Sequence, residues 1–130
     1  VEAGLVGADV VGSDAQAKMA RGARENFRAY LDDFAVLRAD ATRIPLVDDA
    51  VDGVVFDAPY GRQSAIQSRD LDSLVAGALA EARRVAPRAV VVGDRDWESA
   101  AREAGWHVED TFRRRVHRSL VRHVLVLDRG

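Results

Sequence analysis

An acidic tetrapeptide follows a short apolar run near the middle of the chain. The run at residues 54–56 reads Val-Val-Phe, and the next four residues are Asp57, Ala58, Pro59 and Tyr60. Such a run predicts a buried strand, and a proline cannot continue a central strand, so Asp57 falls where the strand leaves its sheet. In an open α/β sheet, ligands bind at that edge.

These residue types suit a reaction at the exocyclic amine of a nucleobase. The amine is a poor nucleophile because its lone pair is delocalised into the ring, and two acceptors that hold its N–H bonds would release that lone pair. The Asp57 carboxylate and the Ala58 carbonyl are two such acceptors, and Asp57 could also take the proton as a general base. Pro59 would fix the turn, and Tyr60 could stack on the base. The alternative is an ordinary strand-to-loop turn.

Two further carboxylates, Asp14 and Asp40, follow predicted strands. Parallel strands place their C-terminal ends along one rim, so we expect these two acids and Asp57 to line one crevice. Asp14 suits a nucleoside ribose, because an acceptor-only carboxylate can satisfy two vicinal hydroxyl donors. Asp40 could accept from an adenine amine, with the Ala41 N–H facing a ring nitrogen. Each acid alone could instead form a turn or, in the case of Asp14, cap the next helix.

Strands and helices alternate along the chain, with bounds set by apolar spacing. We expect strands at residues 10–14, 34–38, 53–56 and 89–93, helices at 15–30, 71–86 and 96–105, and a loop at 60–69. Residues 106–117 and 120–129 alternate apolar and polar side chains, which predicts a hairpin at a sheet edge. This order predicts a single doubly wound α/β domain over residues 1–130.

Composition argues against several classes of protein. The chain has no cysteine, which excludes disulfides, thiol nucleophiles and cysteine-ligated zinc. No apolar run approaches the roughly 20 residues that span a bilayer, and no charged-then-apolar leader is present, so we expect a cytoplasmic protein without a membrane partner. The three histidines show no metal-ligand spacing, and we expect no metal site. A net charge of −2 gives no general attraction to nucleic acid.

The segment DAPYG resembles the Asp/Asn-Pro-Pro-Tyr/Phe motif of S-adenosylmethionine-dependent amino-methyltransferases. Residues 2–27, 38–46 and 117–127 are similar to one branch of them, the archaeal tRNA guanine-N2 methyltransferases that modify guanosine 10. The resemblance implies a Rossmann-like class I methyltransferase sheet with a C-terminal antiparallel hairpin, and S-adenosylmethionine as cofactor. The implied reaction is methyl transfer to the N2 amine of a guanosine in tRNA, by direct attack of the amine on the sulfonium methyl.

The resemblance also assigns roles to individual residues. The implied catalytic segment is Asp57, Ala58, Pro59 and Tyr60. Asp14 would contact the cofactor ribose, and Asp40 with Ala41 would lie near its adenine. Ala58 stands where the family usually has its first proline. Since this position would contribute a backbone carbonyl, we expect the acceptor to be kept while the loop loses some rigidity.

The family's first motif, a strand and a glycine-rich turn that holds the methionine part of the cofactor, would precede residue 1. An RNA-binding THUMP module, through which the family reaches tRNA, would lie further upstream. We therefore expect a C-terminal portion of a catalytic domain that lacks the first strand of the sheet. That strand would lie between those ending at Asp14 and Asp57, so we expect this polypeptide alone to be destabilised and to bind S-adenosylmethionine weakly or not at all.

Two other functions stay open. The acidic motif could serve another planar amine, such as adenine in DNA or ribosomal RNA or a protein glutamine, or the chain could be a truncated, non-catalytic remnant. Arginines of the closing hairpin could contact tRNA phosphates, but we favour a solvated face that discourages edge pairing. These arginines are Arg113, Arg115, Arg118 and Arg122. We expect Trp97 and Trp106 to lie in the core or at its rim.

Overall fold

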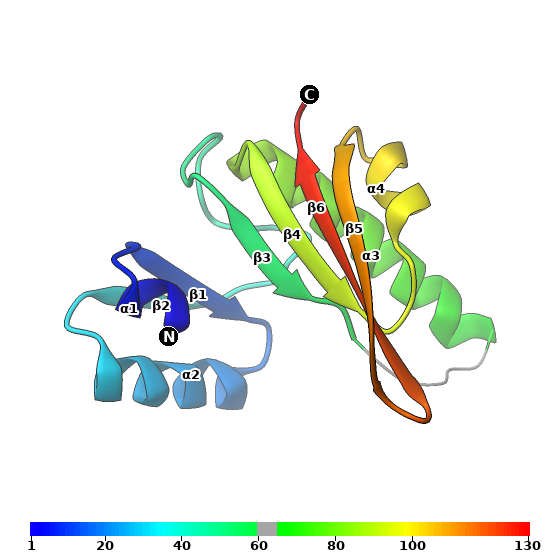
Figure 1. The fold of residues 1–130 in the computed structure, drawn as a ribbon. Helices are drawn as coiled ribbons and strands as arrows, with labels where there is room; N and C mark the ends of the chain where they lie inside the picture. The colour runs from blue at the N-terminus through cyan, green and yellow to red at the C-terminus, as the bar shows by residue number, and fades with distance from the viewer. Residues whose placement is uncertain (60–64) are drawn as a thin grey trace. The chain divides into compact units, whose positions relative to one another are not determined.

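The computed structural model describes residues 1–59 and 65–130 (Figure 1). For residues 65–69 it describes the backbone only. The chain divides into two compact units, Val1–Pro45 and Leu46–Gly130, and each is described by itself. Both combine helices with strands. The predicted α/β class is therefore confirmed, whereas the single domain over residues 1–130 stays a prediction.

The smaller unit is a two-stranded parallel sheet with one long helix. Its elements are α1 (Glu2–Leu5), β1 (Val10–Asp14), α2 (Ala17–Tyr30) and β2 (Phe34–Arg38). The strands pair in register from Val10 opposite Phe34 to Asp14 opposite Arg38. Phe27 of α2 meets Phe34 edge to face, with 5.6 Å between the ring centroids. A Cβ at Gly12 would lie 3.0 Å from the Phe27 ring, so a residue without a side chain allows α2 to pack closely on β1.

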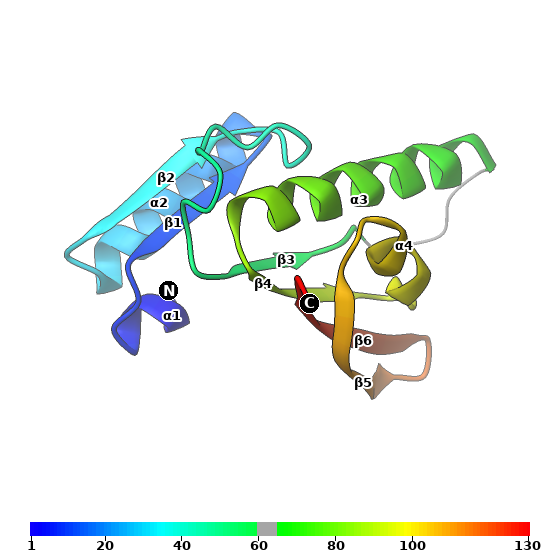
Figure 2. The same ribbon diagram turned by 90° about the horizontal axis from the view of Figure 1, so that it is seen from above.

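The larger unit is a four-stranded sheet with strand order β3-β4-β6-β5. Its elements are β3 (Val54–Asp57), α3 (Ala65–Val85), β4 (Arg88–Gly93), α4 (Glu98–Glu103), β5 (His107–His117) and β6 (Leu120–Asp128). β3 and β4 run parallel, and β6 is antiparallel to both of its neighbours. Figure 2 shows α3 and α4 on the same face of this sheet. The predicted C-terminal hairpin is confirmed.

The core of the larger unit lies between α3 and the sheet. Leu71, Val75 and Leu79 recur every four residues along α3, which brings them onto one face, and all three are buried. They belong to one cluster with strand residues such as Val91 and Leu127. Burial of this stripe removes apolar surface from water and so stabilises the unit.

One predicted boundary was wrong. Residues 65–69 were expected in a loop, but α3 already begins at Ala65. The prediction relied on apolar periodicity, which starts only at Leu71. The stretch AIQSRD before it contains neither glycine nor proline, so nothing in it opposes an additional helical turn.

Among the described strands, four have a free edge: β1 and β2 in the smaller unit, and β3 and β5 in the larger one. Within the described residues, β1 pairs only with β2, and β3 pairs only with β4. The expected absence of a strand between β1 and β3 stays a prediction. No helix of the described ranges is both long and apolar enough to cross a membrane.

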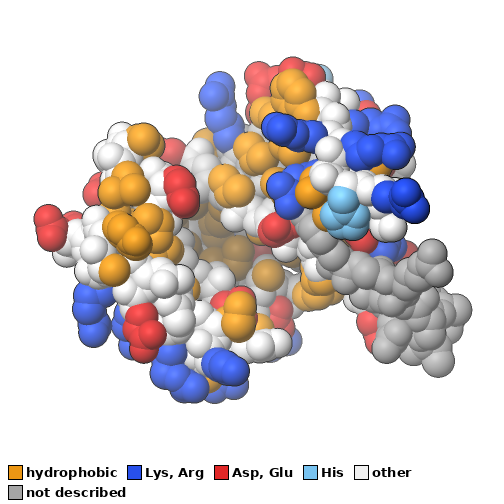
Figure 3. All heavy atoms as spheres, turned by 60° about the horizontal axis from the view of Figure 1, so that its bottom comes forward, with side chains coloured by type: hydrophobic (Ala, Val, Ile, Leu, Met, Phe, Trp, Pro, Cys, Tyr) orange, Lys and Arg blue, Asp and Glu red, His pale blue; other side chains and the backbone are white. Residues whose placement is uncertain are grey.

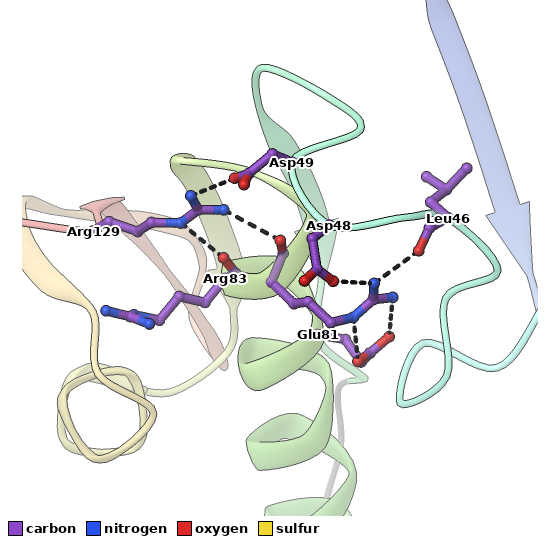
Figure 4. A network of polar contacts seen from close by, with 7 residues as sticks. Leu46, Asp48, Asp49, Glu81, Arg83 and Arg129 are labelled. Atoms are coloured by element: carbon purple, nitrogen blue, oxygen red, sulfur yellow. Dashed lines mark hydrogen bonds and ion pairs between the residues drawn. The ribbon is translucent and has the colours of Figure 1, made fainter.

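Arg84 ties the loop before β3 to α3 through hydrogen bonds to three residues, Leu46, Asp48 and Glu81, which Figure 4 labels. Its guanidinium donates to both carboxylate oxygens of Glu81, each at 2.9 Å, and to Asp48 Oδ1 at 2.9 Å. It also donates to the Leu46 carbonyl at 2.8 Å. The hydrogen bonds that Arg84 donates to Glu81 and then to Asp48 raise the pKa of Arg84, so the side chain stays charged at any physiological pH.

The last carbonyls of α3 are satisfied by other segments. The Arg129 guanidinium donates to the Arg83 carbonyl at 2.8 Å and the Arg84 carbonyl at 3.3 Å, and it pairs with Asp49. The Asp49 N–H donates to the Arg84 carbonyl and the Val51 N–H to the Val85 carbonyl. The helix end therefore has few of the unpaired carbonyls that a free C-terminus would leave.

Candidate active site

Asp57 is the last residue of β3, as predicted, and its side chain is exposed. Its backbone lies opposite Val92 of β4. Within the described part of the chain, the Asp57 carboxylate has no hydrogen-bond or ion-pair partner. Both of its oxygens are therefore available to accept hydrogen bonds from a ligand.

Ala58 is held in place by its backbone and by its side chain. Its N–H donates to the Val92 carbonyl at 2.7 Å, which extends the parallel pairing one residue beyond β3. Its side chain is buried, with 3% of its surface exposed. A proline at this position would have no N–H to donate, so alanine gains a restraint that partly replaces the expected loss of rigidity.

Gly93, which sequence reasoning passed over, makes room for this arrangement. A Cβ at Gly93 would lie 2.8 Å from Trp97 Nε1, 3.0 Å from Trp97 Cδ1 and 3.6 Å from the Ala58 Cβ. The indole therefore lies against the end of β4, close to Ala58. The available sequence signal was a glycine that ends an apolar run, AVVVG, opposite the end of β3.

Trp97 is buried, as expected, but one of its polar atoms is not satisfied. The side chain is 5% exposed, and the indole ring lies 5.3 Å from the Arg95 guanidinium. Its Nε1–H has no hydrogen-bond partner in the described residues. By contrast, the equally buried Trp106 donates to the Leu79 carbonyl at 2.9 Å. An unsatisfied buried donor costs about 1–3 kcal/mol.

Asp14 and Asp40 lie at the same end of the two-stranded sheet. Asp14 is opposite Arg38, and the Ala39 N–H donates to the Asp14 carbonyl at 3.0 Å. The Asp14 side chain accepts from the Gln16 N–H at 2.8 Å through Oδ1. The N-cap of α2 is Gln16 rather than Asp14, so the capping alternative was wrong and Asp14 instead forms the preceding turn.

Asp40 accepts two hydrogen bonds from one neighbour. Its Oδ1 is 2.8 Å from the Thr42 backbone nitrogen and 2.7 Å from the Thr42 hydroxyl. The backbone bond, then the hydroxyl bond, with a smaller contribution from Arg43, lower the pKa of Asp40. The carboxylate is therefore ionised at neutral pH, with its second oxygen available. The N–H of the adjacent Ala41 has no partner in the described residues.

The remaining expectations are only partly addressed. Pro59 is exposed, and Tyr60 lies outside the described residues. The structure brings Asp14, Asp40 and Ala41 together in one unit, and Asp57 with Ala58 in the other, so a shared crevice stays a prediction. Residues 1–59 and 65–130 contain no group of acidic and histidine side chains that could hold a metal ion.

Chemically, the end of β3 offers two kinds of acceptor side by side. One is the unpaired carboxylate of Asp57, and the other is the carbonyl of Ala58, for which the described residues supply no hydrogen-bond donor. Two adjacent acceptors suit a group with two N–H bonds, such as an exocyclic amine. Because Asp57 pairs with Val92 and the Ala58 N–H donates to the Val92 carbonyl, the backbone of both residues is positioned before a ligand arrives.

Comparisons with known proteins agree with this chemistry. The chain is 36% identical over 141 aligned residues to the tRNA (guanine(10)-N2)-dimethyltransferase of Methanothermobacter thermautotrophicus, covering 99% of this chain and 40% of that relative. The chain thus spans about two fifths of the relative's length. This match confirms the resemblance to the C-terminal portion of such enzymes.

Solved structures share the fold. TrmN from Thermus thermophilus superposes with a TM-score of 0.76 at 23% identity, over 97% of this chain and 38% of that one. Magnesium protoporphyrin IX methyltransferase from Synechocystis, solved with bound S-adenosylmethionine, gives 0.70 at 16% identity, over 97% of this chain and 62% of that one. The profile of the RMKL-like methyltransferase domain matches residues 2–123, and the chain belongs to that family.

Proposed function

We propose that this chain is the catalytic portion of an S-adenosylmethionine-dependent tRNA methyltransferase that acts on the N2 amine of a guanosine. The observation that carries the proposal is the pair of acceptors at the end of β3: an Asp57 carboxylate without a partner in the described residues, beside the carbonyl of Ala58, whose N–H is held by Val92. Membership of a methyltransferase family and the identity to a guanosine-10 enzyme support the same reaction.

The cofactor contacts are proposed for the smaller unit. Asp14 and Asp40 each use only Oδ1 in a local turn, which leaves Oδ2 of each carboxylate available. The Ala41 N–H, which has no partner among the described residues, is a donor next to Asp40 in the chain. Two carboxylate acceptors and one donor fit a ribose and an adenine edge, so these residues would hold the nucleoside part of S-adenosylmethionine. When bound, the cofactor supplies a methyl group activated by its sulfonium.

The residues of the larger unit would act on the amine. Asp57 and the Ala58 carbonyl accept its two N–H bonds and direct the nitrogen lone pair away from the ring. As the nitrogen–methyl bond forms and the methyl–sulfur bond breaks, the nitrogen becomes positively charged. Asp57 stabilises that charge and can accept the released proton. Holding both reactants in line would contribute much of the acceleration.

The test is a methyl-transfer assay with radiolabelled S-adenosylmethionine and purified tRNA, ribosomal RNA and DNA as separate acceptors. The protein to assay is the longest polypeptide that the gene encodes around these 130 residues. We expect label in tRNA as N2-methylguanosine, and a rate lowered about 100-fold or more by Asp57→Asn, which leaves one acceptor oxygen. Label in another acceptor would favour a different amine, and a folded protein without transfer would favour the non-catalytic remnant.

A second measurement concerns the chain alone. The free edges of β1 and β3 leave backbone groups without ladder partners among the described strands. We therefore expect residues 1–130 by themselves to unfold at low denaturant concentration and to bind S-adenosylmethionine weakly or not at all. Low-micromolar or tighter binding by the monomer in calorimetry would contradict this expectation.

A further inference from the structure

The β5–β6 hairpin carries a group of unpaired positive charges. Among the described residues, none of its five arginines has an acidic partner, and all are exposed. They are Arg113, Arg114, Arg115, Arg118 and Arg122. Other arginines of the larger unit do form ion pairs, namely Arg84, Arg95, Arg102 and Arg129. Arg83 and Arg88 of the same unit also lack an acidic partner among the described residues, so the hairpin is distinguished by the concentration of five such arginines between residues 113 and 122.

The sheet register places these arginines beyond the end of β4. Gly93, the last residue of β4, lies opposite His123, which in turn pairs with Arg113. From there the hairpin continues without a third strand to the pair of His117 and Leu120. At roughly 3.3 Å per residue, the tip extends about 10 Å past the sheet. Figure 1 shows the hairpin running on beyond the arrowhead of β4.

This extension leaves the sheet at the same end as the candidate catalytic residues. β3 and β4 are parallel, with Asp57 opposite Val92 and therefore one position before the end of β4. The hairpin tip and Asp57 thus belong to one rim of one unit. A ligand presented to Asp57 would approach from the side to which the arginines extend.

Two of the arginines face each other across the hairpin. Arg114 lies directly opposite Arg122. Like charges at directly opposed positions of an antiparallel pair are destabilising. Side chains alternate along a strand, so this pair occupies one face of the ribbon while Arg113 and Arg115 occupy the other. Both faces of the tip therefore present positive charge at a cost in stability.

Protection of an exposed sheet edge does not account for this pattern. Side chains of either sign of charge discourage pairing with another strand, and the edge of β5 needs that protection equally along its whole length. Yet β5 is divided by sign: Glu109 and Asp110 lie in the half beside the sheet, and the arginines lie in the half beyond it. A segregated, unpaired positive charge instead fits an anionic partner, contrary to the interpretation favoured from the sequence.

An aromatic side chain lies within the same tip. Phe112 is 54% exposed, opposite Val124, and falls on the face of the ribbon that carries Arg114 and Arg122. Figure 3 turns this rim toward the viewer and shows Lys and Arg side chains grouped around a histidine. Exposed aromatic rings among guanidinium groups are typical of surfaces that stack unpaired bases while holding the phosphate backbone.

We propose that the hairpin tip, residues 112–123, binds the phosphate backbone of the RNA whose target nucleotide enters the site at Asp57. This inference rests on the proposed function and adds the surface of the catalytic unit that holds the substrate. Arg114 and Arg122 contact phosphates on one face of the ribbon. Binding there relieves their mutual repulsion, because each charge gains an anionic neighbour.

The test measures binding of a labelled tRNA transcript by fluorescence anisotropy at several salt concentrations, using the full gene product. The double variant Arg114→Gln/Arg122→Gln should bind about tenfold more weakly and reduce the slope of log Kd against log salt by about 1 to 2. The matched control is Arg88→Gln. Arg88 is also an exposed arginine, at the opposite end of β4, and its loss should change neither value.

The outcomes separate this inference from the proposed function. If the wild type binds tRNA and the folded double variant binds it with the same affinity and slope, the hairpin proposal is overturned while the enzymatic one stands. If the variant loses binding but the wild type transfers no methyl group, the hairpin proposal stands and the enzymatic one fails. A wild type that binds no RNA overturns both. Thermal unfolding of each variant confirms that it is folded.

Discussion

The two ends of the four-stranded sheet differ in how completely their polar groups are paired, although Asp94 and Arg95 just after β4 do pair with each other. At the end where β4 begins and β6 finishes, Arg129 binds the carbonyls of α3, Trp106 donates to Leu79, and His107 lies 3.8 Å from Asp128. At the other end, the Asp57 carboxylate has no partner in the described residues and the Trp97 N–H is buried without one.

This difference separates groups that hold the fold from groups that are available to a ligand. Paired groups contribute to stability because each desolvated charge or donor regains a hydrogen bond on folding. Unpaired groups at the other end contribute nothing comparable, and the opposed pair of Arg114 and Arg122 is unfavourable. Sites of binding and catalysis are where such costs are retained.

The largest expected effect on stability comes from Gly93→Ala, which fills the space beside Ala58. The new Cβ would lie 2.8 Å from the Trp97 indole, a rigid and buried ring, so the indole must shift. We expect a loss of about 1–3 kcal/mol in urea unfolding. The control is Gly22→Ala in α2, where a Cβ meets nothing within 4 Å, and there the helix should gain about 0.5–1 kcal/mol. Equal effects at both sites would remove the argument for close packing.

The two tryptophans form a matched pair for the next comparison. Both are buried and flank α4, but only Trp106 uses its N–H in a hydrogen bond. Trp106→Phe loses that bond, whereas Trp97→Phe removes an unsatisfied donor, and the loss of ring volume is similar. We expect Trp106→Phe to cost about 1–2 kcal/mol more than Trp97→Phe in chemical denaturation. A larger cost at Trp97 would show that its N–H is satisfied in solution.

A smaller effect distinguishes the arginines of the two ends. Arg129→Met should lower the free energy of unfolding by about 1 kcal/mol, because carbonyls of α3 lose a charged donor. Arg114→Met changes an exposed side chain without a described partner, so its effect should stay within about 0.5 kcal/mol. Both are measured by the same urea titration. Comparable losses would contradict the division of the sheet into a paired and an unpaired end.

The smallest effect concerns a carboxylate of the smaller unit, Asp40. Unlike Asp57, it is held by its neighbour, and Thr42→Val removes the hydroxyl bond that helps to lower its pKa. A carboxyl group whose pKa is lower in the folded state stabilises the fold at pH values above its unfolded-state pKa. This stabilisation is lost as the pH falls through the folded-state pKa. Wild type and variant should therefore differ in stability at pH 7 and converge below about pH 4. Carbon-detected NMR titration should show a higher pKa for Asp40 in the variant.

Several features of the fold could be predicted because they depend on local pattern. Apolar runs and breakers placed Asp57 at the end of β3, and alternation predicted the hairpin of β5 and β6. The start of α3 at Ala65 was missed because periodicity reports burial and not helix formation. The family could be recognised from residues 57–61 and from the other segments that resemble it. The match of the methyltransferase family model to residues 2–123 confirms this recognition.

The sequence by itself determined the order of the elements, the identity of the candidate acceptors at residues 57 and 58, and the concentration of arginine near the C-terminus. Only the tertiary structure showed that Gly93 admits Trp97 beside Ala58 and that Ala58 is held by Val92. It also showed that Arg114 faces Arg122 beyond the end of β4. Local pattern follows from each segment's own residues, whereas contacts between distant segments depend on strand register and packing.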